Sequence, residues 1–242
     1  MIKFNFHNHG FEIINLGESK NIKLLRKKII DIFSYASKFN GLGKLKNDQD
    51  IEKLYKKNKK VWISAYDQAR MLPDIYNVIN GKIINKICKI AKIKFPSLTS
   101  KPIIRICMPN GVGTSLTDLH IDYPTHRGSK NSITIWIPLQ KTNKINGTLR
   151  LSPFSQKEKN FYGSIENSSV IRKKKIESKK NVNPEIKLGE AIILSQFTVH
   201  ASEVNYSDQI RFSLDFRLND LSDKDYAKRL YYINEKNYFK KI

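Results

Sequence analysis

The chain has 242 residues, 40% of them hydrophobic, a length and composition that suit one large domain with a buried core. Its formal net charge of +22 invites a nucleic-acid partner, but only 9 of its 44 basic residues are Arg, the side chain that reads bases and phosphates in bidentate fashion. Two cysteines are too few for a disulfide scaffold, so we expect a cytoplasmic protein. No apolar run approaches the roughly 20 residues of a membrane helix, so we expect no membrane partner. The low share of Arg makes a nucleic-acid partner the less favoured interpretation of the charge.

The first hundred residues are predicted to be mainly helical. Within residues 23–37 the apolar side chains recur at intervals of three and four, which is the period of one helical face. Residues 74–93 repeat this pattern, and the helix-breaking Pro96 follows them. We therefore expect residues 1–100 to form helices that brace a sheet.

From residue 101 the sequence pattern changes to short β-branched runs separated by Asn, Gly, Pro and Ser. This pattern predicts a mainly β core over residues 101–218. A polar, Lys-rich stretch at about residues 156–183 interrupts the strands and is predicted to be a loop, either a lid or disordered. Residues 219–242 are predicted to form a C-terminal helical tail. The whole chain, residues 1–242, is thus predicted to be a single α+β, mainly β domain.

Two candidate metal ligands, His120 and Asp122, are separated by one residue. On an extended segment both side chains point the same way, so an imidazole nitrogen and a carboxylate oxygen become neighbouring ligands. A second histidine completes the facial triad of non-haem iron enzymes, which leaves coordination positions open. His200 follows the hydrophobic run at residues 191–194 and is predicted to lie at a strand end. In a chain with five His and 12 Asp, a His-x-Asp pair alone is weak evidence.

Eleven residues after His200, Arg211 opens a segment, residues 211–217, in which polar and apolar side chains alternate strictly. An ordinary antiparallel strand turns such a polar face to solvent. If the polar face instead lines a barrel interior, the guanidinium of Arg211 can grip the carboxylate of a small ligand with two parallel hydrogen bonds. The residues alone leave both arrangements open.

These motifs together resemble a known family, the phytanoyl-CoA dioxygenase-like iron(II) and 2-oxoglutarate dependent oxygenases. The resemblance covers roughly residues 100–218. The motifs that carry it keep the family's order and spacing. They are the His-x-Asp pair, the strand at residues 132–139 that contains Trp136, a segment at residues 147–155 similar to the family's Gly-x-Leu and Pro-Gly-Ser-His run, and His200-Ala201-Ser202 followed by Arg211.

The resemblance implies a double-stranded β-helix core, the jelly-roll or cupin-like fold, braced by the N-terminal helices. It implies Fe(II) as the metal, with 2-oxoglutarate and O2 as co-substrates. It also implies hydroxylation of an unactivated carbon in a small polar metabolite, with release of succinate and CO2. The residues that it assigns are His120, Asp122 and His200 as catalytic metal ligands, and Arg211, Ser202, Trp136 and Thr134 around the 2-oxoglutarate.

The substrate is indicated only by charge. Arg127, Lys130, Arg150 and Arg217 predict a basic entrance suited to an anionic or sugar-like molecule, and His126 is a candidate substrate contact. Two other functions stay open. One is a non-catalytic ligand- or metal-binding barrel of the same fold, and the other is a basic nucleic-acid-associated protein, for which charge is the sole indication.

Overall fold

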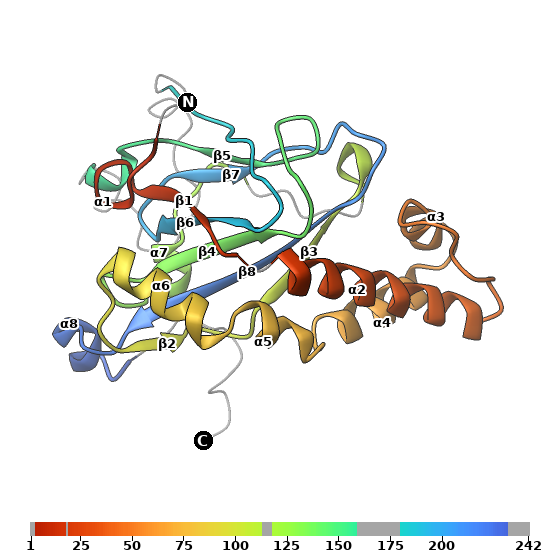
Figure 1. Ribbon diagram of the computed structural model, residues 1–242, viewed down its shortest axis with the longest axis horizontal. Coiled ribbons are helices and arrows are strands. Elements are labelled where there is room, and N and C mark those ends of the chain that lie inside the picture. Colours follow the sequence, from red (N-terminus) through yellow and green to blue (C-terminus); the bar gives the residue numbers. More distant parts are fainter. Residues whose placement is uncertain (1–2, 18, 113–117, 159–179, 232–242) are drawn as a thin grey trace.

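The computed structural model describes residues 3–17, 19–112, 118–158 and 180–231. Two antiparallel sheets and a layer of helices on one face of the larger sheet make up the fold (Figure 1). The strands are β1 (Phe11–Asn15), β2 (Pro96–Leu98), β3 (Ile103–Cys107), β4 (Ile133–Pro138), β5 (Leu149–Leu151), β6 (Glu190–Ser195), β7 (His200–Ser202) and β8 (Arg211–Asp220). The α-helices are α1 (Phe6–His9), α2 (Ser19–Phe39), α3 (Asp50–Lys57), α4 (Lys59–Ala69), α5 (Asp74–Val78), α6 (Gly81–Ala91), α7 (Tyr123–His126) and α8 (Lys224–Lys228).

The helices of the first hundred residues follow the apolar periodicity, with one correction. Residues 23–37 lie inside α2, which packs against α4 and α5. Residues 74–93 do not form the single helix that their pattern predicts. The chain breaks at Asn80, whose side chain accepts a hydrogen bond from the backbone N–H of Ile83 at 3.2 Å and so caps a new helix, α6. The same part of the chain also supplies β1, which joins the larger sheet beside β6.

The larger sheet has six strands in the order β1-β6-β4-β8-β2, and β3 pairs with β8 beside β2. All of these pairings are antiparallel. The smaller sheet pairs β5 with β7, and single bridges extend it on both sides, His120 opposite His200 and Val182 opposite Leu151. The predicted β core braced by N-terminal helices is therefore confirmed, and its sheets are antiparallel.

Strand β8 presents two chemically different faces, and all ten of its residues are buried. Phe212, Leu214 and Phe216 belong to the main hydrophobic core, which the sheet shares with the helices. The residues that alternate with them face the smaller sheet, where Trp136 and Leu149 belong to a second apolar cluster. The polar face of β8 thus turns inward, which decides between the two arrangements that the alternation allows.

The loop predicted at about residues 156–183 is described only at its ends. Ser155–Lys157 form one turn of 3-10 helix, and Val182 exchanges backbone hydrogen bonds with the smaller sheet. Residues 159–179, the body of the predicted loop, lie outside the described residues.

The predicted tail, residues 219–242, begins inside a strand rather than after it. β8 extends to Asp220 because β2 pairs with its last residues, and α8 follows. Residues 232–242 lie outside the described residues. Cys88 and Cys107 are free and buried. No helix in the described part of the chain has the length and apolar character needed to cross a membrane.

The inward packing of β8 predicts a large loss of stability when an aromatic side chain is removed from it. Phe216 is only 1% exposed, so we expect Phe216→Ala to lower the free energy of unfolding by about 3–5 kcal/mol. Urea unfolding measures the difference. Phe39→Ala is the matched control, because Phe39 is 78% exposed and its removal should change stability by no more than about 0.5 kcal/mol. Equal losses in the two variants would contradict the assignment of Phe216 to the core.

Candidate metal centre

Two histidines are held side by side by the backbone of the smaller sheet. His120 and His200 exchange backbone hydrogen bonds at 3.0 and 2.9 Å, and their ring centroids lie 4.2 Å apart. Each ring is fixed by a carbonyl two residues earlier, since Nδ1 of His120 lies 2.7 Å from the oxygen of Asp118 and Nδ1 of His200 lies 3.0 Å from that of Thr198. A carbonyl only accepts, so each Nδ1 donates and each Nε2 keeps a lone pair for a metal.

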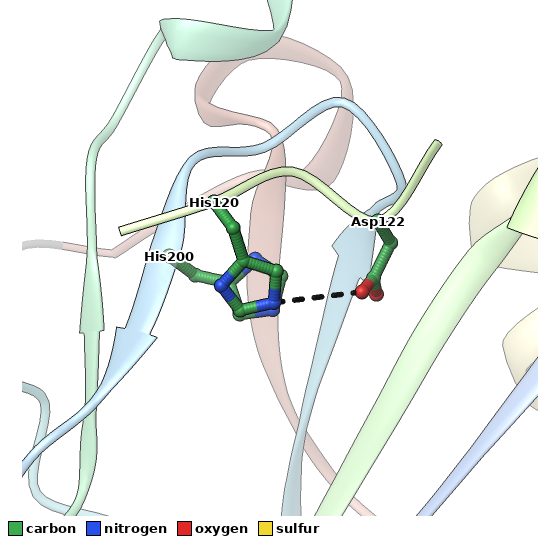
Figure 2. Close-up of side chains that lie close together, drawn as sticks. All are labelled: His120, Asp122 and His200. Atoms are coloured by element: carbon green, nitrogen blue, oxygen red, sulfur yellow. Dashed lines mark ion pairs between the residues drawn. The ribbon is translucent and has the colours of Figure 1, made fainter. Parts of the chain in front are cut away.

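The third ligand comes from a turn and not from the strand that the spacing predicts. Asp122 has helical backbone angles at the start of α7, and its N–H donates to the carbonyl of Gln196 at 3.0 Å. The turn still brings its carboxylate to the histidines (Figure 2). Its Oδ1 lies 3.7 Å from Nε2 of His120, and ligand atoms of His120, Asp122 and His200 all lie within 4.8 Å of one another.

This donor set fits a divalent first-row metal. Two imidazoles and one carboxylate on one side of the ion leave the other side open, as in the facial triad of non-haem iron sites. Burial, and next the neighbouring His120, lowers the pKa of His200 to about 4. His200 is therefore neutral at neutral pH, which is the form that binds metals.

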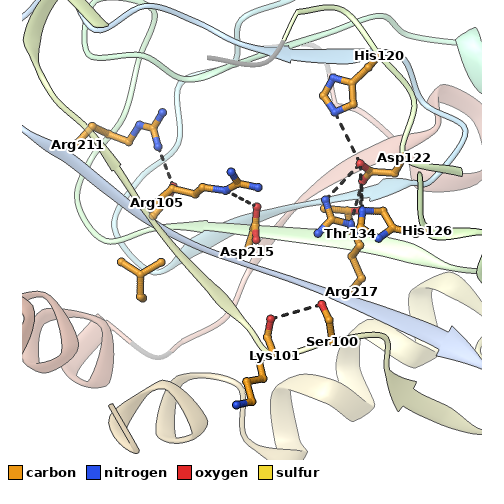
Figure 3. A network of polar contacts seen from close by, with 12 residues as sticks. Ser100, Lys101, Arg105, His120, Asp122, His126, Thr134, Arg211, Asp215 and Arg217 are labelled. Carbon is orange, nitrogen blue, oxygen red and sulfur yellow. Dashed lines mark hydrogen bonds and ion pairs between the residues drawn. The ribbon is translucent and has the colours of Figure 1, made fainter. Parts of the chain in front are cut away.

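The buried carboxylate of Asp122 has a dedicated counter-charge (Figure 3). Arg217 donates from Nε to Oδ2 at 3.3 Å and from Nη2 to Oδ1 at 3.2 Å, and the hydroxyl of Thr134 donates to Oδ2. Burial by itself raises the pKa of Asp122. Arg217 and then His120 outweigh burial, so the pKa is held well below its ordinary value and the side chain stays an anionic ligand.

These contacts correct one prediction and refine another. Arg217 is not part of a basic entrance, because it is only 7% exposed and is committed to Asp122. Of the other residues assigned to that entrance, Lys130 pairs with Asp225 and Arg150 with Glu203. Thr134, expected beside the co-substrate, lines the cavity and also donates to the metal ligand.

His126, a candidate substrate contact, lies beside Asp122. Its Nε2 is 4.0 Å from Oδ1 of Asp122. Burial, and next the charge of Arg217, lowers the pKa of His126 to about 4, so the ring is neutral at neutral pH. A neutral ring adds little charge to the site, and compensation of Asp122 is left to Arg217.

A cavity of about 250 Å³ adjoins the triad and contains the remaining predicted residues. Arg211 lies in it with its guanidinium 5.5 Å from the centre of the Trp136 ring. Arg211 donates from Nε to the carbonyl of Gly147 at 3.1 Å and from Nη1 to Oγ of Ser213 at 2.8 Å. Ser202, Thr134, His120 and His200 line the same cavity.

Arg211 is buried without a counter-ion. It is 3% exposed, and burial lowers the pKa of its guanidinium. Among the described residues no carboxylate forms an ion pair with it, since both of its hydrogen bonds are to neutral groups. A buried guanidinium is costly without an anion, so the geometry fits an anionic ligand beside Arg211.

Comparisons with known proteins agree with this arrangement. The family profile described as phytanoyl-CoA dioxygenase (PhyH) matches residues 48–213, a range that contains the triad and Arg211. A 2-aminoethylphosphonate dioxygenase from Uncultured bacterium HF130_AEPn_1 is 30% identical over 139 residues. These are 56% of this chain and 50% of the relative, so the chain spans about half the length of the curated relative that it matches.

Solved structures share the fold at low identity. The carbocyclase SnoK from nogalamycin biosynthesis, described as non-heme and alpha ketoglutarate dependent, aligns over 92% of this chain and 87% of its own, with a TM-score of 0.62 and 15% identity. AviO1 from Streptomyces viridochromogenes Tue57 covers 90% and 93%, with a TM-score of 0.59 and 13% identity. EctD from S. alaskensis, with 2-oxoglutarate and 5-hydroxyectoine, covers 90% and 74%, with a TM-score of 0.58 and 12% identity.

The contact between Arg217 and Asp122 predicts a role in metal affinity. In Arg217→Met the buried carboxylate loses its counter-charge and is held less firmly, so we expect binding of Mn²⁺ or anaerobic Fe²⁺ to weaken about 10–100-fold. Isothermal titration measures the affinity. Arg70→Met is the matched control, because Arg70 lies on the surface of the helical layer. Unchanged metal binding in Arg217→Met would contradict this role, and tighter binding would show that the arginine competes with the metal for Asp122.

Proposed function

The chain belongs to the phytanoyl-CoA dioxygenase family of non-haem iron oxygenases, and on that premise we propose that it is an Fe(II)- and 2-oxoglutarate-dependent dioxygenase. One observation carries the proposal. Two members of a candidate metal-binding triad, His120 and His200, line the same cavity as Arg211, a buried arginine that has no counter-ion among the described residues, and an enzyme that binds iron and a dicarboxylate together requires this combination. A non-catalytic barrel that binds a ligand or a metal needs only one of these two features, and a nucleic-acid-binding surface needs neither.

In this proposal His120, Asp122 and His200 hold the iron from one side. When bound, the iron supplies the oxidative chemistry, in which 2-oxoglutarate is converted to succinate and CO2 while an unactivated carbon of the substrate is hydroxylated. The protein supplies orientation. Carbonyls fix both imidazoles with Nε2 toward the site, and Arg217 with Thr134 fixes the carboxylate.

We assign the distal carboxylate of 2-oxoglutarate to Arg211. The hydrogen bonds to Gly147 and Ser213 hold its guanidinium in one orientation, and Trp136 flanks it. A planar fork held in this way can donate two parallel hydrogen bonds to a carboxylate. Ser202 lines the same cavity from β7, and we assign its hydroxyl as a further donor to that carboxylate.

We further propose that the two sheets form the double-stranded β-helix, or jelly roll, of the iron oxygenases. The bridge between His120 and His200 and the bridge between Leu151 and Val182 add two short segments to the smaller sheet. Side chains of β4, β5 and β6 fill the space between the sheets, which supports a closed two-sheet barrel around the metal site.

The substrate is proposed to be a small polar metabolite. A cavity of about 250 Å³ that also admits 2-oxoglutarate leaves room for only a small molecule. The name of the curated relative, a 2-aminoethylphosphonate dioxygenase, points to the same class. We place the protein in the cytoplasm, because both of its cysteines are buried, free thiols.

The proposed reaction predicts that succinate forms only when the triad is intact. The protein is loaded anaerobically with Fe²⁺ and 2-oxoglutarate, exposed to oxygen, and assayed for succinate. We expect the native chain to release succinate and His120→Ala to fall to the level of metal-free protein, because the open-sided triad has lost a ligand. His7→Ala, which alters an exposed histidine of α1, is the matched control. Native protein that binds neither the metal nor 2-oxoglutarate would refute the proposal.

The assignment of Arg211 predicts a separable defect. Arg211→Ala removes a charge-assisted pair of hydrogen bonds, so we expect 2-oxoglutarate to bind about 10–100-fold more weakly to the metal-loaded protein. Metal affinity should stay the same, since Arg211 does not contact the triad. Titration of Mn²⁺ and then of 2-oxoglutarate separates the two affinities. Equal affinity for 2-oxoglutarate in Arg211→Ala and the native chain would sink this assignment.

A further inference from the structure

We propose that Arg105 and Asp215 form the binding site for the molecule that is oxidised, and that they select a small zwitterion. Such a molecule carries an anionic group for Arg105 and an N–H donor, best an ammonium, for Asp215. The inference rests on the proposed function and deepens it, because it names the chemical class of the substrate. Both residues line the cavity that His120 and His200 also line. Figure 3 shows the side chains of Arg105 and Asp215 in contact.

The pair is built by the pairing of two strands. Arg105 on β3 lies opposite Ser213 on β8, so Asp215 is its diagonal neighbour on the inner face. Nε of Arg105 donates to Oδ2 of Asp215 at 3.1 Å. Along β8, Asp215 lies between Arg211, assigned to 2-oxoglutarate, and Arg217, which contacts Asp122. The pair thus occupies the part of the cavity between these two functions.

Asp215 presents an oxygen that no described group uses. Its side chain is 9% exposed, and its Oδ1 accepts no hydrogen bond within the described part of the chain. A buried carboxylate oxygen in that state is rare in folded proteins and indicates a missing partner. Trp62, which lines the same cavity from α4, has a buried indole N–H that likewise has no described acceptor. The cavity therefore holds a buried acceptor and a buried donor that no described group uses.

Arg105 is the accessible arginine of the cavity. Three arginines are among its described lining residues, and Arg211 and Arg217 are only 3% and 7% exposed. The side chain of Arg105 is 40% exposed, so it stands where a molecule enters from solvent. Its one ion pair uses Nε and leaves the Nη groups without a partner among the described residues. A guanidinium fork at the mouth of a cavity suits an incoming carboxylate or phosphonate.

Charge distinguishes this pair from the co-substrate site. 2-Oxoglutarate is a dianion, which the carboxylate of Asp215 repels and Arg211 attracts. Arg217 is already neutralised by Asp122. Asp215 and Arg105 together offer one negative and one positive group, an arrangement complementary to a molecule that carries both signs. An ammonium placed at Oδ1 would satisfy the buried oxygen and fix the orientation of the substrate against the metal.

The test is a titration of four probes into protein loaded with Mn²⁺ and 2-oxoglutarate. Two probes are zwitterions, 2-aminoethylphosphonate and β-alanine, and two keep a single charge, ethylphosphonate and ethylamine. We expect at least one zwitterion to bind about tenfold or more tightly than either single-charge probe, the equivalent of one good charged contact. If neither zwitterion binds a protein that does bind the metal and 2-oxoglutarate, the inference is overturned while the proposed function stands.

Two variants show whether the pair itself makes the selection. In Asp215→Asn we expect the preference for the zwitterion over ethylphosphonate to disappear. In Arg105→Gln we expect binding of the three probes that carry an anionic group to weaken about tenfold. A purely structural role would weaken all probes alike and leave the ratio unchanged. The surface variants Asp67→Asn and Arg70→Gln, from an exposed Arg–Asp pair, are matched controls. Loss of 2-oxoglutarate affinity with unchanged zwitterion selectivity would assign the pair to the co-substrate and overturn the inference.

Discussion

One strand with two opposite faces is the constraint on which the rest of the structure depends. β8 is buried along its whole length, and its aromatic and aliphatic residues anchor the helices to the larger sheet. The alternating residues cannot then reach solvent, so Arg211, Asp215 and Arg217 are forced into the interior. A fold that buries these charges has to provide each with a partner, and those partners define the functional site.

Each buried charge is compensated in a different way. Arg217 neutralises Asp122, so that this carboxylate stays anionic and oriented beside the imidazoles of His120 and His200. Among the described residues Arg211 contacts only neutral groups, so we assign its counter-ion to a bound molecule. Oδ2 of Asp215 accepts a hydrogen bond from Arg105, and its Oδ1 has no partner among the described residues. The metal ligand is therefore compensated from within the protein, whereas the rest of the cavity is left to be completed by its ligands.

The triad and Arg211 could be predicted because their signals are local: a one-residue spacing, a histidine after an apolar run, and an arginine at a fixed interval in an alternating strand. The backbone conformation of Asp122 could not be predicted from the spacing, since its carboxylate reaches the site from a turn and not from a strand. Arg217 lies on the same face of β8 as Arg211, but its partner Asp122 is 95 residues away in sequence. The partner of Arg105, Asp215, is 110 residues away. Such pairs depend on strand register, which composition and spacing do not reveal.

A crystal structure of the protein, prepared anaerobically with Fe²⁺ and 2-oxoglutarate, tests the central claim most directly, because it locates both ligands at once. It should show a single iron bound by Nε2 of His120, Nε2 of His200 and the carboxylate of Asp122, and a 2-oxoglutarate whose distal carboxylate lies against Arg211. Iron bound elsewhere, or 2-oxoglutarate anchored on Arg105 with Arg211 left without an anion, would contradict it.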